Sequence, residues 1–305
     1  CCDWSSDVCS SDLGNEKLQN YFSYANTTGH GIIGKHNLSK HNLTFRETSV
    51  LLNSRLKLDG SMNLMRQVVK NKPTVGGFYM NPLVGLYRFP RGEDIAYYKE
   101  NFEVYDEGRN LNIQNWHTSY EDFEQNPYWI TNRILSKENR MHVIVSLSAN
   151  LKINDWLSLQ ARGNVDYIND KVRQQFYAST APALAGANGR YIEMDYQETQ
   201  YYGDAILMMK KQWDAFSLNA ALGVSINDKT VNSTRYDSKT ASLKYANVFN
   251  LANIIMNGSA GLDQKIDARR QLQSLFATAQ LGYNEFVYLD LSARNDWSST
   301  LAYTS

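Results

Sequence analysis

Apolar and polar residues alternate along much of the chain. In the segment 143–153 the odd positions are apolar, from Val143 to Ile153, while most even positions are polar. The segment 216–226 alternates with the opposite parity, since its even positions run from Phe216 to Ile226. A period of two is typical of β-strands whose two faces meet different surroundings. Repeated over several segments this long, the pattern predicts an all-β fold.

The pattern divides the chain into nine strands joined by two kinds of link. The predicted strands lie at 17–28, 41–52, 55–69, 141–153, 156–169, 200–212, 215–227, 269–283 and 286–297. Four links are tight and contain Asn or Asp, as hairpin turns prefer: Asn53-Ser54, Asn154-Asp155, Trp213-Asp214 and Asn284-Glu285. The other links are long, and the longest spans 70–140. Short and long links alternate, which is typical of transmembrane β-barrels with short periplasmic turns and long extracellular loops.

Composition agrees with a membrane barrel and excludes other classes of protein. The 305 residues include 31 basic and 31 acidic side chains, so no net charge favours nucleic acid. No apolar run is long enough for a membrane-spanning helix, whereas a transmembrane strand needs only about ten alternating residues. All five prolines lie in the long links 70–140 and 170–199. We therefore predict an antiparallel transmembrane β-barrel fragment of about nine strands that contacts the lipid bilayer.

The alternation also predicts which side chains face the lipid. We expect nine apolar residues on the convex, lipid-facing side: Val143, Val145, Leu147, Leu151, Leu218, Leu222, Val224, Leu289 and Leu291. Polar residues of the opposite parity are expected to face the lumen: Arg162, Asp166, Asn219 and Arg294.

The first thirteen residues differ from the rest of the chain. All three cysteines (Cys1, Cys2 and Cys9) lie here, in a stretch without regular alternation. They could form a metal ligand set or include a lipidated cysteine. The segment CCDWSSDVCSSDL, however, resembles translated sequencing-adapter sequence. We therefore interpret 1–13 as a non-native leader that lies outside the sheet, and 14–305 as a partial barrel.

Several segments with recognisable motifs stand in order along the chain: FSYANTTGHGIIGKHNLSKHNLTFR (22–46), VKNKP (69–73), NPLVGLYRFPRG (81–92), QNW (114–116), QNPYWITNR (125–133), YAST (177–180), NGRY (188–191) and RNDWSSTL (294–301). Together they resemble the middle barrel region of the SusC/RagA family of TonB-linked outer-membrane transporters. The segments QNPYW and RNDWSS are the most specific. Gly34 departs from the pattern, since relatives often have proline after the Gly-Ile-Ile run.

This resemblance implies a fold, a function and partners. It implies a 22-stranded barrel closed by a plug, located in the outer membrane of a Bacteroidota-like Gram-negative bacterium. The plug domain would precede residue 14, and the closing strands would follow Ser305. Substrate, a glycan or a peptide, would bind outside with a SusD-like lipoprotein as a lid. TonB, ExbB and ExbD would supply energy from the proton gradient.

No enzymatic chemistry is evident in the sequence. The five histidines lack the spacing of a zinc site, and no nucleophile has a nearby His-Asp set. We therefore expect no catalytic residues, no metal and no cofactor, and predict that the protein is not an enzyme.

The link 70–140 contains the candidate binding residues. Aromatic rings stack on sugars, and Arg or Asn side chains bond their hydroxyl groups. The candidates for contact with substrate or with a docking partner are Tyr79, Arg88, Arg91, Trp116, Tyr128 and Trp129. The same aromatic residues could instead form the small core that a link of this length needs, or a docking surface for the lid.

Two other functions remain open at this point. The barrel could be a passive outer-membrane porin or an adhesin, or the chain could be a secreted glycan-binding all-β protein. An antiparallel sheet in meander order, with long loops at one end only, favours the barrel interpretations over the secreted one.

Overall fold

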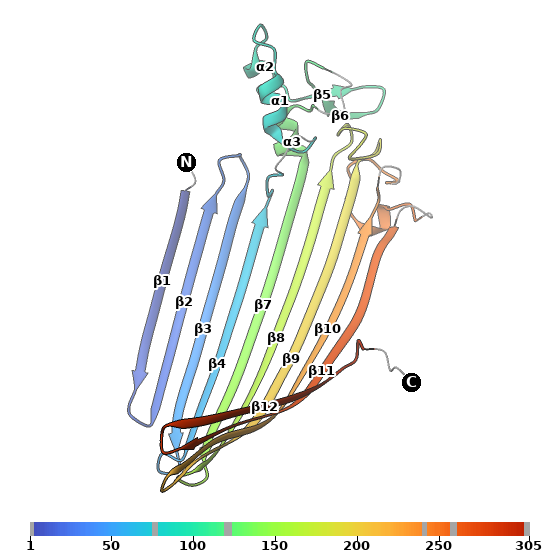
Figure 1. The fold of residues 1–305 in the computed structure, drawn as a ribbon. Helices are drawn as coiled ribbons and strands as arrows, with labels where there is room; N and C mark the ends of the chain where they lie inside the picture. The colour runs from blue at the N-terminus through green and yellow to red at the C-terminus, as the bar shows by residue number, and fades with distance from the viewer. Residues whose placement is uncertain (1–2, 75–78, 119–123, 240–242, 257–260, 302–305) are drawn as a thin grey trace.

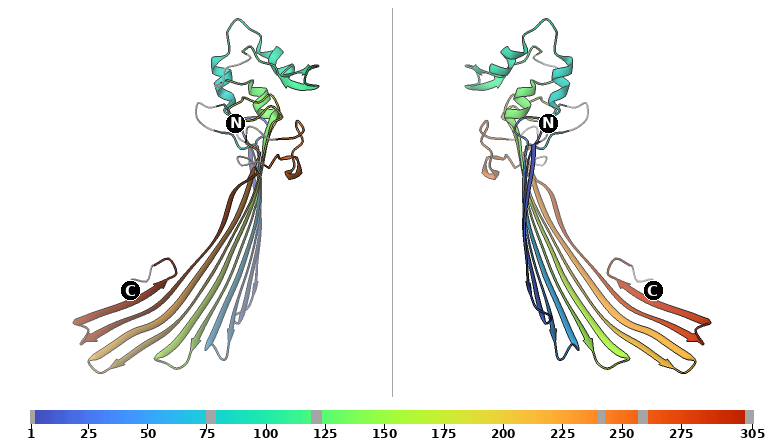
Figure 2. Two further views of the ribbon diagram at one scale, coloured as in Figure 1. Left: turned by 90° about the vertical axis from the view of Figure 1, so that its right-hand side faces the viewer. Right: turned by 90° about the vertical axis from the view of Figure 1, so that its left-hand side faces the viewer.

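The protein is a single curved antiparallel sheet with loops gathered at one end (Figures 1 and 2). The computed structural model describes residues 3–74, 79–118, 124–239, 243–256 and 261–301. The sheet order is β1-β2-β3-β4-β7-β8-β9-β10-β11-β12. Its strands are β1 (Asp3–Gly14), β2 (Leu18–His30), β3 (Asn37–Leu51), β4 (Leu56–Lys70), β7 (Ile134–Lys152), β8 (Leu157–Phe176), β9 (Arg190–Trp213), β10 (Phe216–Asp237), β11 (Gly261–Tyr283) and β12 (Val287–Ser298).

The remaining elements lie in the loops. The longest loop, between β4 and β7, contains three helices and a separate two-stranded sheet. They are α1 (Pro82–Arg88), α2 (Ile95–Glu100), β5 (Glu103–Asp106), β6 (Leu111–Gln114) and α3 (Pro127–Arg133). A short 3₁₀ helix, η1 (Leu251–Asn253), lies between β10 and β11. Among the described residues, no helix is long and apolar enough to cross a membrane.

The predicted meander is confirmed. All nine predicted strands are present, and each pairs with its sequence neighbour once the β5-β6 hairpin is set aside. The long loops lie at one end of the sheet, here called the loop end, and the tight turns lie at the other, the turn end (Figure 1). The fold class predicted from alternation, an arc of a transmembrane antiparallel barrel, is therefore the one observed.

Several strands are longer than predicted at the loop end. β9 begins at Arg190 rather than at residue 200, and β11 begins at Gly261 rather than at residue 269. Alternation marks only the part of a strand with one apolar face. Beyond it neither face is uniformly apolar, but the backbone ladder continues because neighbouring strands still offer donors and acceptors.

The first strand corrects the prediction for residues 1–13. We expected this segment to lie outside the sheet, but β1 pairs regularly with β2, from Asp3 opposite His30 to Gly14 opposite Gln19. Without it β2 would present a free row of backbone groups, which an extended segment can pair with regardless of its side chains. The side chains of residues 7–14 are all exposed. The main sheet thus has ten strands rather than nine.

The origin of this segment is a separate matter from its pairing. Cys9 is a free, exposed cysteine, whereas Cys1 and Cys2 lie outside the described residues. That 1–13 is a non-native leader stays a prediction.

The two faces of the sheet have opposite character. Strand register places all nine predicted lipid-facing residues on one face and the four predicted luminal residues on the other. On the apolar face Leu222 is 52% exposed, while on the polar face Asp204 and Ser274 are only 7% and 4% exposed. Side chains crowd on the inside of a curved sheet and spread on its outside. The apolar face is therefore the convex one, and the polar face lines the concave lumen.

Aromatic residues mark the turn end of the apolar face. The ammonium Nζ of Lys211 lies 5.2 Å from the ring centre of Trp156 and 5.3 Å from that of Trp213. Both rings are partly exposed beside tight turns. This is the position expected for an interfacial aromatic girdle, with a cation that reaches the headgroup level.

The apolar belt, defined as the outward-facing apolar residues of β7–β12, ends at a different register position on each strand. Its last members toward the loop end are Met141, Tyr167, Tyr201, Ile226, Leu275 and Ala293. Each lies two residues closer to the turn end than the residue directly opposite the preceding member. Met141, for example, is opposite Asn169, and Tyr167 is two residues nearer the turn end; the same offset recurs on every strand to β12. A belt of constant height across tilted strands requires such an offset. The positions at which the apolar residues end therefore indicate strands tilted as in a membrane barrel.

A charged residue in the apolar belt should destabilise the intact barrel. We expect Leu222→Arg to lower the free energy of unfolding by about 2–4 kcal/mol, because the guanidinium would enter the bilayer. Urea titration of the protein folded into lipid vesicles measures this change. The matched control is Asn219→Arg, three residues away on the luminal face, which should cost much less. Equal losses in both variants would contradict the assignment of faces.

Candidate functional site

The loops at the loop end form a folded unit that we call the cap. It comprises the described residues of 71–133, 177–189 and 238–260, between β4 and β7, β8 and β9, and β10 and β11. An apolar core joins Ile130 of α3 and Ala185 of the second loop to Ile134, Phe176 and Ile192 at the ends of β7, β8 and β9. The cap therefore packs onto the ends of the central strands rather than hanging from them.

Asn126 is the centre of the cap. It has no exposed surface, and its side-chain oxygen accepts a hydrogen bond from Tyr128 N at 2.8 Å as the N-cap of α3. Its Nδ2 donates to the backbone carbonyls of Tyr98 (3.0 Å) and Asn115 (2.8 Å). One side chain thus caps a helix and joins α2 to the segment after β6. Pro127 follows at the first helical position, where proline suits the missing donor.

Gln125 extends the same junction to the neighbouring loops. Its Nε2 donates to Tyr79 O at 2.7 Å, and its Oε1 accepts from Ala181 N at 2.8 Å. Glu124, also buried, accepts from Trp116 Nε1 (3.0 Å) and contacts His117 Nε2 at 2.7 Å. The three consecutive polar residues before Pro127 therefore connect most parts of the cap.

An ion pair fastens α3 to the β5-β6 hairpin. The Arg133 guanidinium binds both carboxylate oxygens of Glu103, at 2.7 and 2.6 Å. It also lies over the rings of Phe102 and Tyr177, 5.5 and 5.0 Å from their centres. Such a planar, stacked contact needs arginine rather than lysine.

The six predicted site residues fall into two groups. Trp129 is 1% exposed and its Nε1 donates to Thr180 Oγ1 at 3.1 Å, while Trp116 is 8% exposed and packs against Phe89 and Tyr98. These two rings belong to the core of the cap, so they offer no face to a ligand. For Trp116 and Trp129, burial favours the alternative interpretation, in which the aromatic residues form the core of the loop.

The other four candidates have accessible surface. Arg88 and Arg91 are exposed, and Tyr79 and Tyr128 are half-buried. Arg88 contacts the buried Glu124, with Nε and Oε2 3.4 Å apart. The role of these four residues in binding stays a prediction.

The luminal wall is lined by charged pairs that link neighbouring strands. Arg162 on β8 binds Asp204 on β9 at 2.7 Å, and Tyr202 donates to the same carboxylate at 2.6 Å. Further cross-strand ion pairs on this face include Arg46–Asp59, Arg140–Asp170 and Lys229–Glu198, and His142 Nε2 lies 2.7 Å from Asp166. They present a hydrophilic surface with little uncompensated charge.

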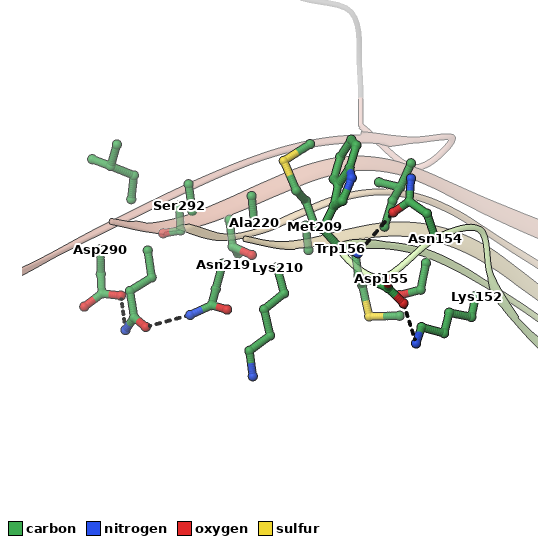
Figure 3. Close-up of a pocket in the computed structure, with 18 residues that line it drawn as sticks. Lys152, Asn154, Asp155, Trp156, Met209, Lys210, Asn219, Ala220, Asp290 and Ser292 are labelled. Atoms are coloured by element: carbon green, nitrogen blue, oxygen red, sulfur yellow. Dashed lines mark hydrogen bonds and ion pairs between the residues drawn. The ribbon is translucent and has the colours of Figure 1, made fainter. Parts of the chain in front are cut away.

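A hollow of about 800 Å³ lies on the luminal face near the turn end (Figure 3). Lys210, Asn219 and Asp290 project from the concave side, whereas Met209 and Trp156 project from the convex side. The lining residues come from β7 to β12 and from the turn between β7 and β8, and strand register brings them together. No sequence motif marks this surface, so sequence reasoning missed it.

A second buried cluster anchors β9 to β10 at the loop end. Both oxygens of the Asp237 carboxylate accept from Arg190, at 2.8 and 2.7 Å, and Lys239 N donates to it at 2.8 Å. Burial raises the pKa of Asp237, but these hydrogen bonds and the attraction of Arg190 and Arg235 outweigh it and leave the pKa below its ordinary value of 3.8. Sequence reasoning missed the pair because its members are far apart in the chain.

Removing the Asn126 side chain should loosen the cap without affecting the barrel. Asn126→Ala deletes the helix cap and leaves two buried carbonyls unpaired, so we expect the cap to open more easily by about 2–4 kcal/mol. Hydrogen exchange in 79–118 and 124–133 measures this. Asn126→Asp is the control, since it keeps the cap acceptor but loses both donors and should be intermediate. Unchanged exchange in Asn126→Ala would contradict the central role.

Acid should break the Arg190–Asp237 ion pair at the loop end of β9 and β10. Because the folded-state pKa of Asp237 is depressed, its pairing stabilises the cap above about pH 4 and is lost as the pH falls through the lowered pKa. We expect hydrogen exchange in 184–192 to increase in that acid range. Asp237→Asn should be less protected at neutral pH and should lack this step. An identical acid profile in both proteins would exclude Asp237 as the cause.

Among the described residues, no group of three or more His, Cys, Asp or Glu side chains could hold a metal ion. No protein-family model matches the sequence, and no curated protein matches it.

Solved structures do match, over nearly the whole chain. The RagAB peptide transporter is 16% identical, with a TM-score of 0.72 over 98% of this chain and 32% of that chain. FpvA of P. aeruginosa is 12% identical, with a TM-score of 0.60 over 97% of this chain and 35% of that chain. The ferric-catecholate import receptor Fiu of E. coli K12 in its closed form is 11% identical, with a TM-score of 0.53 over 97% and 39%. The chain thus spans about a third of these chains, and it has the fold of the barrel wall of SusC/RagA-like, TonB-dependent transporters.

Proposed function

We propose that the chain is part of an importer in the outer membrane of a Bacteroidota-like bacterium, driven by TonB, ExbB and ExbD. The observation that supports this best is the combination of an offset apolar belt, a polar lumen and a folded cap at one end only. Structures described as a peptide importer, as a ferric-catecholate import receptor and as FpvA bound to pyoverdines are each similar to it over 97% of this chain. The loop end then faces outside, and the turn end faces the periplasm.

The surface of the sheet disfavours the secreted alternative. Leu147, Leu222 and Leu291 are each more than half exposed on one continuous face. A secreted protein would have to cover such a face, whereas lipid solvates it. A passive porin or adhesin has a similar wall, so transport must be tested directly.

The proposed cargo is an oligosaccharide or a peptide. Arg88 and Arg91 can donate to hydroxyl, carbonyl or carboxylate groups, and Tyr79 and Tyr128 can contribute ring surface. The lumen below the cap is hydrophilic and nearly balanced in charge, which suits a polar cargo better than a strongly charged one.

Energy dependence separates active import from passive permeation. Uptake of labelled peptides and oligosaccharides should be measured in cells that express the complete receptor, with and without TonB. We expect uptake to stop without TonB or when a protonophore removes the proton gradient. Continued uptake under both conditions would identify a passive channel, and no uptake of either cargo with intact cell-surface binding would favour an adhesin.

The exposed face of α1 is the proposed docking point for a SusD-like lipoprotein. Leu83, Leu86 and Tyr87 follow the helical spacing of one face, and Tyr87 is 87% exposed. Apolar and aromatic side chains that are exposed together mark interaction surfaces.

Charged substitutions on this face should weaken the complex. We expect the double variant Leu86→Asp/Tyr87→Asp to lower the affinity for the lipoprotein by about tenfold or more. The affinity can be measured by titration of the purified receptor in detergent. Tyr105→Asp, at another exposed tyrosine, on β5, is the control and should leave affinity unchanged. If the control weakens binding and the α1 variant does not, the lid docks elsewhere.

A further inference from the structure

The convex face carries a group of cations just beyond the apolar residues at the loop end. On β4 the outward position after Leu64 is Arg66, and the outward position after Val68 is Lys70. Lys70 lies directly opposite Lys137 on β7, and Lys137 lies opposite Arg173 on β8. These strands are neighbours in the sheet (Figure 1), so four cations lie on one side of three adjacent strands.

Only part of this group has its charge balanced. On β8, Lys171 and Arg173 pair with Asp195 and Glu193 of β9, at 3.5 and 3.3 Å. Within the described part of the chain, Arg66, Lys70 and Lys137 have no ion pair or side-chain hydrogen bond, and all three are exposed.

No acidic residue faces these three cations from the strands around them. Lys70 is opposite Asn37 on β3, and Arg66 is opposite His41. The neighbouring Glu138 has the other parity on β7 and points to the luminal side. Like charges directly opposite each other on a sheet destabilise it. An anion between Lys70 and Lys137 would turn that repulsion into attraction.

The depth of the cluster identifies the anion. Arg66 lies opposite Met141, the last belt residue of β7, Lys70 is the first outward residue beyond Val68 on β4, and Lys137 is the second beyond Met141 on β7. With about 3.3 Å per residue along a tilted strand, the charged groups lie roughly at the level of the lipid headgroups. They also face away from the lumen, so cargo that passes through the barrel does not reach them.

We propose that Arg66, Lys70 and Lys137 bind the phosphate group of a lipid in the outer leaflet. The Arg66 guanidinium supplies a planar pair of donors for phosphate oxygens, and the two ammonium groups add point charges. The orientation of the leaflet rests on the proposed function, whereas the cluster itself does not. The phosphate of such a lipid would balance the positive charge at the end of β4, where the first loop of the cap begins.

The test is lipid selection by the complete receptor. The protein is reconstituted into nanodiscs that contain phosphatidylcholine and phosphatidic acid, released, and analysed by native mass spectrometry for retained lipid. We expect phosphatidic acid to be enriched over phosphatidylcholine in the wild type. In the triple variant Arg66→Gln/Lys70→Gln/Lys137→Gln the enrichment should fall by about tenfold. The control variant Lys171→Gln/Arg173→Gln, which removes cations that are already paired, should keep it.

Three results would overturn the proposal. They are no enrichment in the wild type, an equal loss in the control variant, and displacement of the lipid by millimolar inorganic phosphate, which would indicate a site for free anions. Lipid retention does not depend on transport, so it can be scored even if the uptake experiment excludes an importer. Circular dichroism and heat modifiability show that each variant is folded.

Discussion

Backbone hydrogen bonding in a medium without water is the constraint on which the rest of the structure depends. A strand in lipid must give every donor and acceptor to a neighbouring strand, since an unpaired group costs several kcal/mol, on the order of the cost of breaking a hydrogen bond in hydrocarbon. This explains why none of the five prolines interrupts a strand, and why Pro82 and Pro127 instead begin helices in the cap. It also explains why β1 joins the sheet although the side chains of its residues 7–14 are all exposed.

The wall of the barrel could be predicted from sequence because it obeys a local rule. Leu222 and Asn219 were assigned to opposite faces by parity alone, and register confirms both. The rule fails where one face is no longer apolar, so the loop-end portions of β9 and β11 were not predicted. The rule also missed β1, which has no alternating pattern but still pairs with β2. Backbone hydrogen bonds at an unpaired sheet edge do not require alternating side chains.

The cap could be predicted only as a position along the chain. Its organisation depends on contacts between distant residues, such as Gln125 with Ala181 and Arg190 with Asp237. The segment QNPYW was recognisable, but a motif does not reveal whether its aromatic residue binds a ligand or fills a core. Trp129 proved to be buried, and the polar residues before Pro127 proved to be the ones that connect the loops.

The regular offset of the apolar belt has a consequence for how such walls are built. From β7 to β12 the loop-end limit of the apolar belt shifts by two residues from each strand to the next. Each two-stranded hairpin therefore contains both the offset that corresponds to strand tilt and an apolar segment at the matching depth. The wall is thus modular: the position of a hairpin's apolar side chains relative to its neighbour sets its place in the bilayer, and this relation is the same from one strand to the next.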